Sequence, residues 1–281
     1  MNILGISRSP QFSPNSVDRD AAIFAAVSNK LQRRGHDVSV ISEDLFIAVD
    51  LSEFDLVYSM ARGRDVLEAL ASAEKTDHLR VVNSAQALLK ATRYELVRDL
   101  EQAGIPQPRT QVLSLDELGN LAAPCTLSYP LWLKRGDACA QQAGDVCYLS
   151  SCSENTAALT HFAEKGVSKV IAVEHAVGDL IKFYGVEGTD FFFFAYPTDG
   201  KGFSKFGLEQ HNGQPVHTAF DAEALKTIAD KAARATGFTV YGGDAIVQAD
   251  GTFVIIDFND WPSFSACRKE AAKAIAQRLN Q

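Results

Sequence analysis

The chain has 281 residues, of which 46% are hydrophobic and 22% charged, and its formal net charge is −8. An acidic chain without a run of Lys or Arg is a poor candidate for binding nucleic acid or an anionic membrane surface. No apolar run approaches the roughly 20 residues that span a bilayer, and the first ten residues lack the pattern of a signal peptide. Five cysteines without a CxxC pair favour reduced thiols. We therefore expect a cytoplasmic protein.

Residues 1–82 alternate apolar strands with helices. Strands are expected at 2–7, 38–41, 56–58 and 81–82, and helices at 20–34 and 64–73. This alternation predicts a Rossmann-like parallel α/β domain. Ligands of such sheets bind beyond the carboxyl ends of the strands, where Arg8, Arg62 and Arg64 lie. The arginines are candidates for binding an anionic substrate, although solvated arginines at a helix start are an equally good interpretation.

The remaining chain predicts a mixture of helices and strands. Residues 85–103 predict one helix that ends at Gly104, and Pro106 and Pro108 then stiffen the connection. Strand-like runs alternate with one helix, 154–165, from 112 to 173. Further strands are expected at 180–186 and 190–196, the second with four consecutive phenylalanines that favour a buried strand. Helices are expected at 222–236 and 265–279.

A hairpin near the carboxyl end is the most informative segment. Asp250-Gly251 stands between two apolar runs, a pattern typical of a two-residue turn in which both residues have positive φ. This turn predicts a register in which Val247 faces Val254 and Asp244 faces Asp257. Because side chains alternate along a strand, Asn259 shares the face of Asp257.

Two carboxylates and an amide therefore meet on one patch of the hairpin. Like charges directly opposite each other destabilise a sheet, and a divalent cation such as Mg²⁺, which prefers oxygen ligands, would remove that cost. A protonated or solvated aspartate at the end of the sheet explains the same pattern. The histidines lack HxH or HExxH spacing, so a catalytic zinc site is not expected.

At these residues the sequence resembles the ATP-grasp superfamily. Asp244 and Asp257-x-Asn259 match the family's metal-binding hairpin, and the resemblance extends from about residue 80 to the end. It implies an ATP-grasp fold, in which two α+β lobes enclose ATP, with ATP and Mg²⁺ (or Mn²⁺) as cofactors. The implied domains are a pre-grasp domain, 1–82, and an ATP-grasp domain, 83–281, with a small lobe at about 109–173 and a large lobe at about 174–281.

The resemblance also implies phosphate-binding residues. Lys134 matches the strand lysine that contacts the α-phosphate, although an isolated lysine is more often a surface residue. Arg93 stands where many relatives have a phosphate-binding lysine. Residues 136–146 match the loop that closes over the phosphates, but with glycine only at 136 and 144. Cys139 in this loop is interpreted as a packed thiol rather than a nucleophile.

Residues 173–179 look like the linker between the lobes. The resemblance implies that its backbone, around His175 and Val177, bonds the adenine, and that Glu174 or Asp179 takes the ribose hydroxyls; without the resemblance this is an ordinary strand exit. Lys182 matches a basic residue near the transferred phosphoryl group, where positive charge stabilises the transition state.

The resemblance favours a carboxylate–amine ligase that forms an acyl phosphate. Lys182 and Arg62 are the candidate catalytic residues, and Arg8, Arg62 and Arg64 the candidates for orienting the acceptor. A small-molecule kinase of the inositol-phosphate type is the alternative, because both hairpin acids are aspartates. A non-catalytic nucleotide-binding protein is a second alternative. We expect a small-molecule substrate, no nucleic-acid or membrane partner, and a possible homodimer, since many relatives dimerise.

Overall fold

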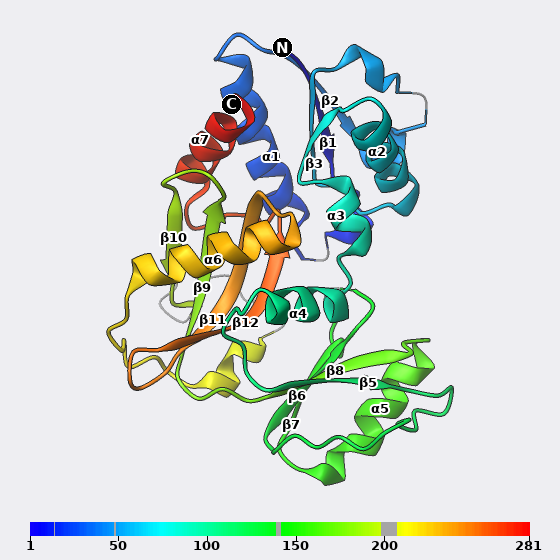
Figure 1. Ribbon diagram of the computed structural model, residues 1–281, viewed down its shortest axis with the longest axis vertical. Coiled ribbons are helices and arrows are strands. Elements are labelled where there is room, and N and C mark those ends of the chain that lie inside the picture. The colour runs from blue at the N-terminus through cyan, green and yellow to red at the C-terminus, as the bar shows by residue number, and fades with distance from the viewer. Residues whose placement is uncertain (14, 48, 139–141, 198–206) are drawn as a thin grey trace.

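The computed structural model describes residues 1–13, 15–47, 49–138, 142–197 and 207–281. Within these residues the strands form three four-stranded sheets, which follow one another along the long axis of the molecule (Figure 1). Short 3₁₀ helices lie in the connections: η1 (Pro10–Phe12), η2 (Glu43–Leu45), η3 (Leu51–Glu53), η4 (Cys152–Glu154) and η6 (Leu208–Asn212).

The first sheet is parallel, as the alternation of strands and helices predicts. It consists of β1 (Asn2–Ser7), β2 (Asp37–Ser42), β3 (Leu56–Ser59) and β4 (Arg80–Val82), in the order β2-β1-β3-β4. Its helices are α1 (Val17–Gln32) and α2 (Arg64–Thr76). The loops after β1 and β3 therefore leave the same edge of the sheet, and they carry Arg8 and Arg62.

The single helix predicted at 85–103 is wrong, because the chain forms two helices there. They are α3 (Ala85–Lys90) and α4 (Arg93–Gln102). The first ends at its C-cap Ala91, and Thr92 begins the second, since its hydroxyl accepts a hydrogen bond from the Glu95 amide at 3.3 Å. Threonine favours this capping position over a helix interior. The break places Arg93 in the first turn of α4, facing the second and third sheets.

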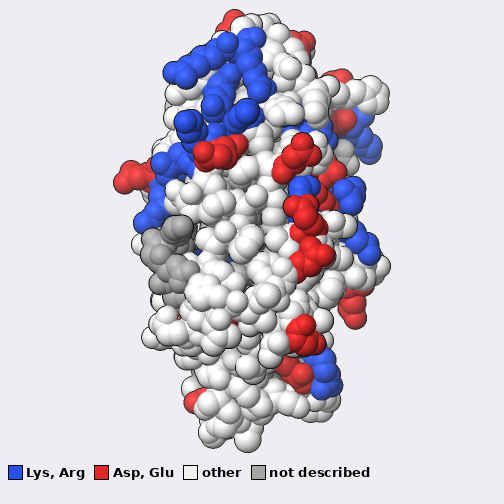
Figure 2. Space-filling view, turned by 90° about the vertical axis from the view of Figure 1, so that its left-hand side faces the viewer, with Lys and Arg blue, Asp and Glu red and all other residues white. Residues whose placement is uncertain are grey.

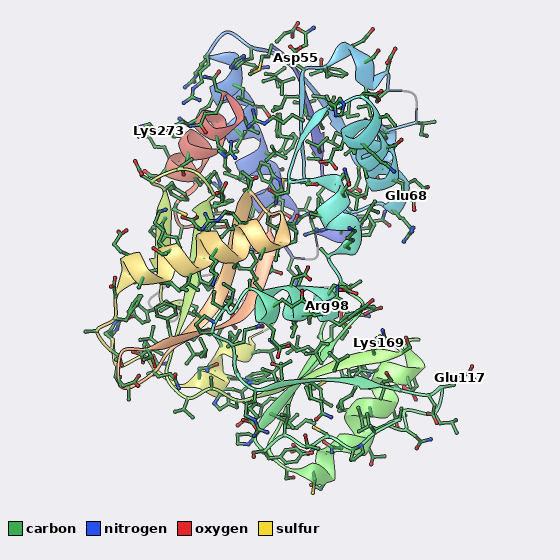
Figure 3. The ribbon with its side chains drawn as sticks, in the orientation of Figure 1. Asp55, Glu68, Arg98, Glu117, Lys169 and Lys273 are labelled. Atoms are coloured by element: carbon green, nitrogen blue, oxygen red, sulfur yellow. The ribbon has the colours of Figure 1, made fainter. Side chains whose placement is uncertain are left out.

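The second sheet, which we call the small-lobe sheet after the lobe predicted at about 109–173, is antiparallel and has its own hydrophobic core. It contains β5 (Thr110–Ser114), β6 (Leu131–Arg135), β7 (Val146–Leu149) and β8 (Lys169–Glu174), in the order β5-β8-β6-β7. Helix α5 (Asn155–Glu164) covers one face, and its Phe162 is fully buried. Lys169 lies beside α4, with its ammonium 4.2 Å from the centre of the Tyr94 ring (Figure 3).

The third sheet carries the predicted hairpin. It contains β9 (Asp179–Val186), β10 (Phe192–Ala195), β11 (Val240–Val247) and β12 (Phe253–Asp260), in the order β10-β9-β11-β12. Helix α6 (Ala222–Thr236) lies across it, and α7 (Arg268–Leu279) packs against α1 (Figure 1). The predicted strand with the phenylalanines is confirmed, and all four pack against the hydrophobic cores, but they are only half-buried, because β10 is an edge strand.

The first and third sheets share their hydrophobic cores. One core joins Leu4 and Ile6 of β1 to Phe183 of β9 and Phe258 of β12. The two sheets are also tied by buried Asn83, whose side chain donates to the Val240 carbonyl at 2.8 Å and accepts from its amide at 2.7 Å. The division of the chain after residue 82 stays a prediction. None of the described helices combines the length and the apolar character that crossing a membrane requires.

Charge is unevenly distributed on the surface. On the face shown in Figure 2, basic side chains gather at the end of the molecule where α1 and α7 pack together. Most acidic side chains on this face lie closer to the middle and the opposite end of the long axis. The described and exposed basic residues of these helices and the turn after α1 include Arg33, Arg34, Lys269 and Lys273. This end is separate from the hairpin.

Candidate active site

Two irregularities of the hairpin together bring Asp244 opposite Asp257. The loop has three residues, 249–251, and only Gly251 has positive φ, at +82°. Val247 therefore faces Phe253, and the predicted two-residue turn and its pairing of Val247 with Val254 are wrong. A bulge at Ile256 adds one residue to β12 and restores the pairing of Asp244 with Asp257. The predicted pairing of the two acids is confirmed, by a different route.

The two carboxylates have different electrostatic surroundings. Burial raises the pKa of Asp244, although Lys182 opposes this by pairing with both carboxylate oxygens at 3.2 and 3.3 Å. Burial acts on Asp257 in the same direction, but Arg93 and Lys134 outweigh it and lower the pKa of that carboxyl group. Asn259 donates to Asp257 at 3.2 Å. Asp257 therefore holds its negative charge more firmly than Asp244.

Two cations from other elements face Asp257. Lys134 on β6 is 9% exposed, and its ammonium donates to the Ile256 carbonyl at 2.8 Å. Burial lowers the pKa of Lys134 to about 8, with Asp257 opposing. Arg93 Nη1 lies 3.9 Å from Asp257 Oδ1, while its buried Nε has no hydrogen-bond partner among the residues that the structure describes. A buried donor of this kind is suited to an anionic ligand.

A single cavity of about 610 Å³ brings most of the predicted site residues together. Its walls come from all three sheets. The hairpin and the basic side chains beside it line one part of the cavity, and the arginines of the first sheet line another. The predicted site residues in the lining are Arg8, Arg62, Arg64, Arg93, Lys134, Glu174, His175, Lys182, Asp244, Asp257 and Asn259.

The three arginines differ in exposure and partners. Arg8 is 10% exposed along its side chain and pairs with Asp20 at 3.1 Å. Arg62 pairs with Asp260, which directly follows Asn259 on β12. Arg64 is 79% exposed and pairs with Glu68, one helical turn away. Arg8 and Arg62 are therefore held in place by neighbouring groups, whereas Arg64 stands at the rim.

The predicted linker is divided by the structure. His175 lines the cavity, and its Nδ1 accepts a hydrogen bond from Trp132 Nε1 at 3.1 Å. Burial, with His211 nearby, lowers the pKa of His175, which favours the neutral ring. Glu174 also lines the cavity, although it already accepts from Arg109 at 2.8 Å and from the Ser128 amide at 2.9 Å.

Val177 and Asp179 lie outside the cavity lining. Val177 is 76% exposed. The buried carboxylate of Asp179 accepts hydrogen bonds from the amides of Val216 and Thr218 at 2.8 and 2.7 Å. Burial opposes its ionisation, but these two bonds outweigh burial and keep the pKa of Asp179 below its usual value. Because these bonds occupy its oxygens, Asp179 is placed less favourably than Glu174 for the ribose hydroxyls; the roles predicted for Asp179 and for the backbone at Val177 stay predictions.

The loop predicted to cover the phosphates borders the cavity at Asp137, Ala138 and Val146. Cys139 and the two residues after it lie outside the described residues. The far end of the loop is anchored by fully buried Asp145, which pairs with Arg135 at 3.3 Å and with Lys165 at 3.5 Å. The four described cysteines are free thiols.

Sequence reasoning missed Glu209 of η6, which lines the cavity and pairs with Lys182 at 3.3 Å. It also missed Asp260, the partner of Arg62. Glu209 lies in an irregular segment with no recognisable spacing, so no signal in the sequence finds it. Asp260 directly follows the predicted Asp257-x-Asn259 motif, and an acid next to a motif was the available signal.

The donor set fits a hard divalent cation. Asp244 and Asp257 supply opposed carboxylates, and Asn259 supplies an amide beside them. The described part of the chain contains no cluster of three or more His, Cys, Asp or Glu residues that could bind a metal ion.

Comparisons with solved structures identify the fold. A RimK-domain ATP-grasp protein from Sphaerobacter thermophilus matches with a TM-score of 0.67 and 17% identity, over 99% of this chain and 100% of that one. D-Ala:D-Ser ligase VanG from Enterococcus faecalis also gives 0.67 and 17%, over 100% and 98%. D-alanine–D-alanine ligase from Bacillus anthracis, solved with ATP, gives 0.63 and 12%, over 99% and 98%.

No family model matches the chain, and no curated protein matches it in sequence. The likeness to the three solved structures extends over almost the whole length of both partners in each comparison. The chain has the ATP-grasp fold, as the resemblance of its hairpin implies.

Proposed function

We propose that the protein is an ATP- and Mg²⁺-dependent enzyme that transfers the γ-phosphoryl group of ATP to a small anionic acceptor. One observation carries this proposal: Asp244 and Asp257 oppose each other in a cavity that also contains Lys134, Arg93 and Lys182. Opposed carboxylates bind a divalent cation, and cations around them bind phosphate oxygens. Phosphoryl transfer requires this combination of positioning and charge neutralisation.

We assign the nucleotide to the part of the cavity between the second and third sheets. Lys134 and Arg93 bind its phosphates, and the buried Arg93 Nε gains a partner. The base lies near Trp132 and His175, and Glu174 is the candidate for the ribose. Mg²⁺, held by Asp244, Asp257 and Asn259, would neutralise phosphate charge when bound. A protein with the same fold has been solved in complex with ATP, which supports the proposal that this fold binds the nucleotide.

We assign the acceptor to the part of the cavity bounded by Arg8, Arg62 and Arg64. Guanidinium groups bind carboxylates in a fixed orientation. The acceptor oxygen attacks the γ-phosphorus as the bond to ADP breaks, and Lys182 and Arg62 stabilise the charge on the transferring group. No covalent nucleophile of the protein is needed.

A carboxylate–amine ligase is the specific activity that we favour. In this reaction an amine attacks the acyl phosphate, and inorganic phosphate leaves. Two of the proteins with the same fold are named as ligases of this kind, a D-alanine–D-alanine ligase and a D-Ala:D-Ser ligase. We further propose a cytoplasmic enzyme with a small-molecule substrate, a homodimeric assembly, and no nucleic-acid or membrane partner.

A small-molecule kinase is the second candidate, because both acids of the hairpin are aspartates. Hydroxylamine separates the two activities. With Mg-ATP and a panel of carboxylic acids and amino acids, a ligase yields a hydroxamate from at least one acid, since hydroxylamine traps acyl phosphates. A kinase yields a stable phosphate ester from a panel of polyols and no hydroxamate. If no ADP forms with either panel, the result contradicts both activities and favours a nucleotide-binding protein without catalysis.

A further inference from the structure

Segment η6 crosses between two sheets and contacts both. Its Glu209 pairs with Lys182 of β9 at 3.3 Å. Its His211 stacks on Tyr148 of β7, with ring centres 4.3 Å apart and an angle of 23°, and meets Trp132 of β6 edge-on at 5.4 Å. In Figure 1 this yellow segment lies between the sheet of β9–β12 and the small-lobe sheet. Contacts on two sides therefore fix the position of Glu209.

Lys182 is held between two carboxylates. Its ammonium lies 3.2 and 3.3 Å from the two oxygens of Asp244 and 3.3 Å from Glu209. The side chains of Lys182, Glu209 and Asp244 are 14%, 16% and 27% exposed. At this degree of burial, ion pairing is stronger than at an open surface. The Lys182 ammonium therefore has a second anionic partner within the cavity.

The oxygens of Asp244 have two competing uses. In the structure they pair with Lys182, whereas the proposed metal site needs them as ligands. A cation that binds Asp244 must displace the ammonium or weaken its pairing. Without another partner, Lys182 would resist this displacement, because it would be left as an unpaired charge in a partly buried site.

We propose that Glu209 is a positioning residue, which holds the Lys182 ammonium when a divalent cation takes the oxygens of Asp244. This inference rests on the proposed function, since it assumes the metal site at Asp244 and Asp257. Glu209 then lowers the cost of metal binding without touching the metal. It also keeps Lys182 inside the cavity, charged and available to the phosphoryl group.

The proposal predicts a specific coupling between Glu209 and Lys182. In Glu209→Gln, the ammonium has lost its second carboxylate and competes more strongly for Asp244, so the affinity for the metal falls by roughly threefold to tenfold. In Lys182→Met there is no competing ammonium, and the affinity rises. The double variant should then bind the metal with the same affinity as Lys182→Met alone.

The test is a titration with Mn²⁺ in the presence of a non-hydrolysable ATP analogue, in which electron paramagnetic resonance measures the free Mn²⁺. It compares the wild type, Glu209→Gln, Lys182→Met and the double variant. Glu209→Asp, which keeps the charge, should recover part of the affinity. Exposed Glu223 on α6 provides the matched control, because Glu223→Gln makes the same chemical change outside the cavity. Thermal melting confirms that each variant is folded.

Two results would overturn the inference while leaving the metal site intact. One is wild-type Mn²⁺ affinity in Glu209→Gln. The other is that Glu209→Gln lowers Mn²⁺ affinity by the same factor in the wild type as in Lys182→Met. Glu209 would then act through its own charge and not through Lys182. Absence of Mn²⁺ binding by the wild type is a different result, which would reject the proposed metal site and the inference together.

Discussion

The ammonium of Lys134 donates a hydrogen bond to the carbonyl of Ile256, the bulge residue of β12, at 2.8 Å. The bulge therefore has two effects. It restores the pairing of Asp244 with Asp257, and it presents a carbonyl that holds Lys134 beside the proposed metal site. The small-lobe sheet and the hairpin are joined at this point.

Nucleotide affinity should depend on pH through Lys134. Burial lowers the pKa of this lysine to about 8 in the free protein, so its charge is present below that pH and is lost as the pH rises through it. Phosphate binds the charged form, and the affinity for an ATP analogue should therefore fall above about pH 8. Calorimetry between pH 6.5 and 9.5 measures this, with the pH range set around that value.

Lys134→Met provides the control for this pH dependence. This variant should bind the analogue more weakly at pH 7, by roughly 100-fold, and its remaining affinity should lack the decline near pH 8. The same decline in Lys134→Met would assign the titration to another group.

Asn83 should contribute strongly to stability. Its amide makes two hydrogen bonds to Val240 at a fully buried position between the first and third sheets. In Asn83→Ala the Val240 amide and carbonyl lose these partners, which should lower the free energy of unfolding by about 2–3 kcal/mol. Urea denaturation measures the change. A loss below about 0.5 kcal/mol would mean that water or a backbone shift replaces both bonds.

Thr92 should control both the start of α4 and the position of Arg93. Thr92→Ala removes the cap on the Glu95 amide, at a cost of about 1 kcal/mol. It should also weaken binding of the ATP analogue, because Arg93 is the first residue of the helix. Thr92→Ser retains a capping hydroxyl and should behave like the wild type. Equal stability of the alanine and serine variants would show that the cap is not needed.

The hairpin illustrates how far local sequence determines this site. Asp250-Gly251 correctly locates the chain reversal, and the two apolar runs beside it locate both strands. The turn type was not predictable, because Asp250-Gly251 also fits a three-residue loop in which Asp250 accepts hydrogen bonds from Thr252. The bulge was not predictable from the hairpin alone, because the partner of its Ile256 carbonyl is Lys134 of another sheet. The predicted pairing of Asp244 with Asp257 is right because the extra loop residue and the bulge residue offset each other.

Other parts of the site depend on contacts between distant segments. Asp179 looks available in the sequence, but the amides of Val216 and Thr218 occupy its carboxylate. Glu209 looks like an ordinary surface acid, but η6 brings it to Lys182. The alternation of strands and helices predicts the parallel first sheet, because that pattern is local. Which side chains line the cavity depends on how three sheets pack together.

The central claim is that Asp244 and Asp257 form a site for a divalent cation that binds together with nucleotide. Mn²⁺ titration of the wild type and of Asp257→Asn, each with the non-hydrolysable ATP analogue, tests it most directly, because the substitution removes charge with almost no change in shape. We predict that the wild type binds Mn²⁺ and that Asp257→Asn, with an unchanged melting temperature, binds it at least about 100-fold more weakly. Equal Mn²⁺ affinity of the two folded proteins would contradict the claim.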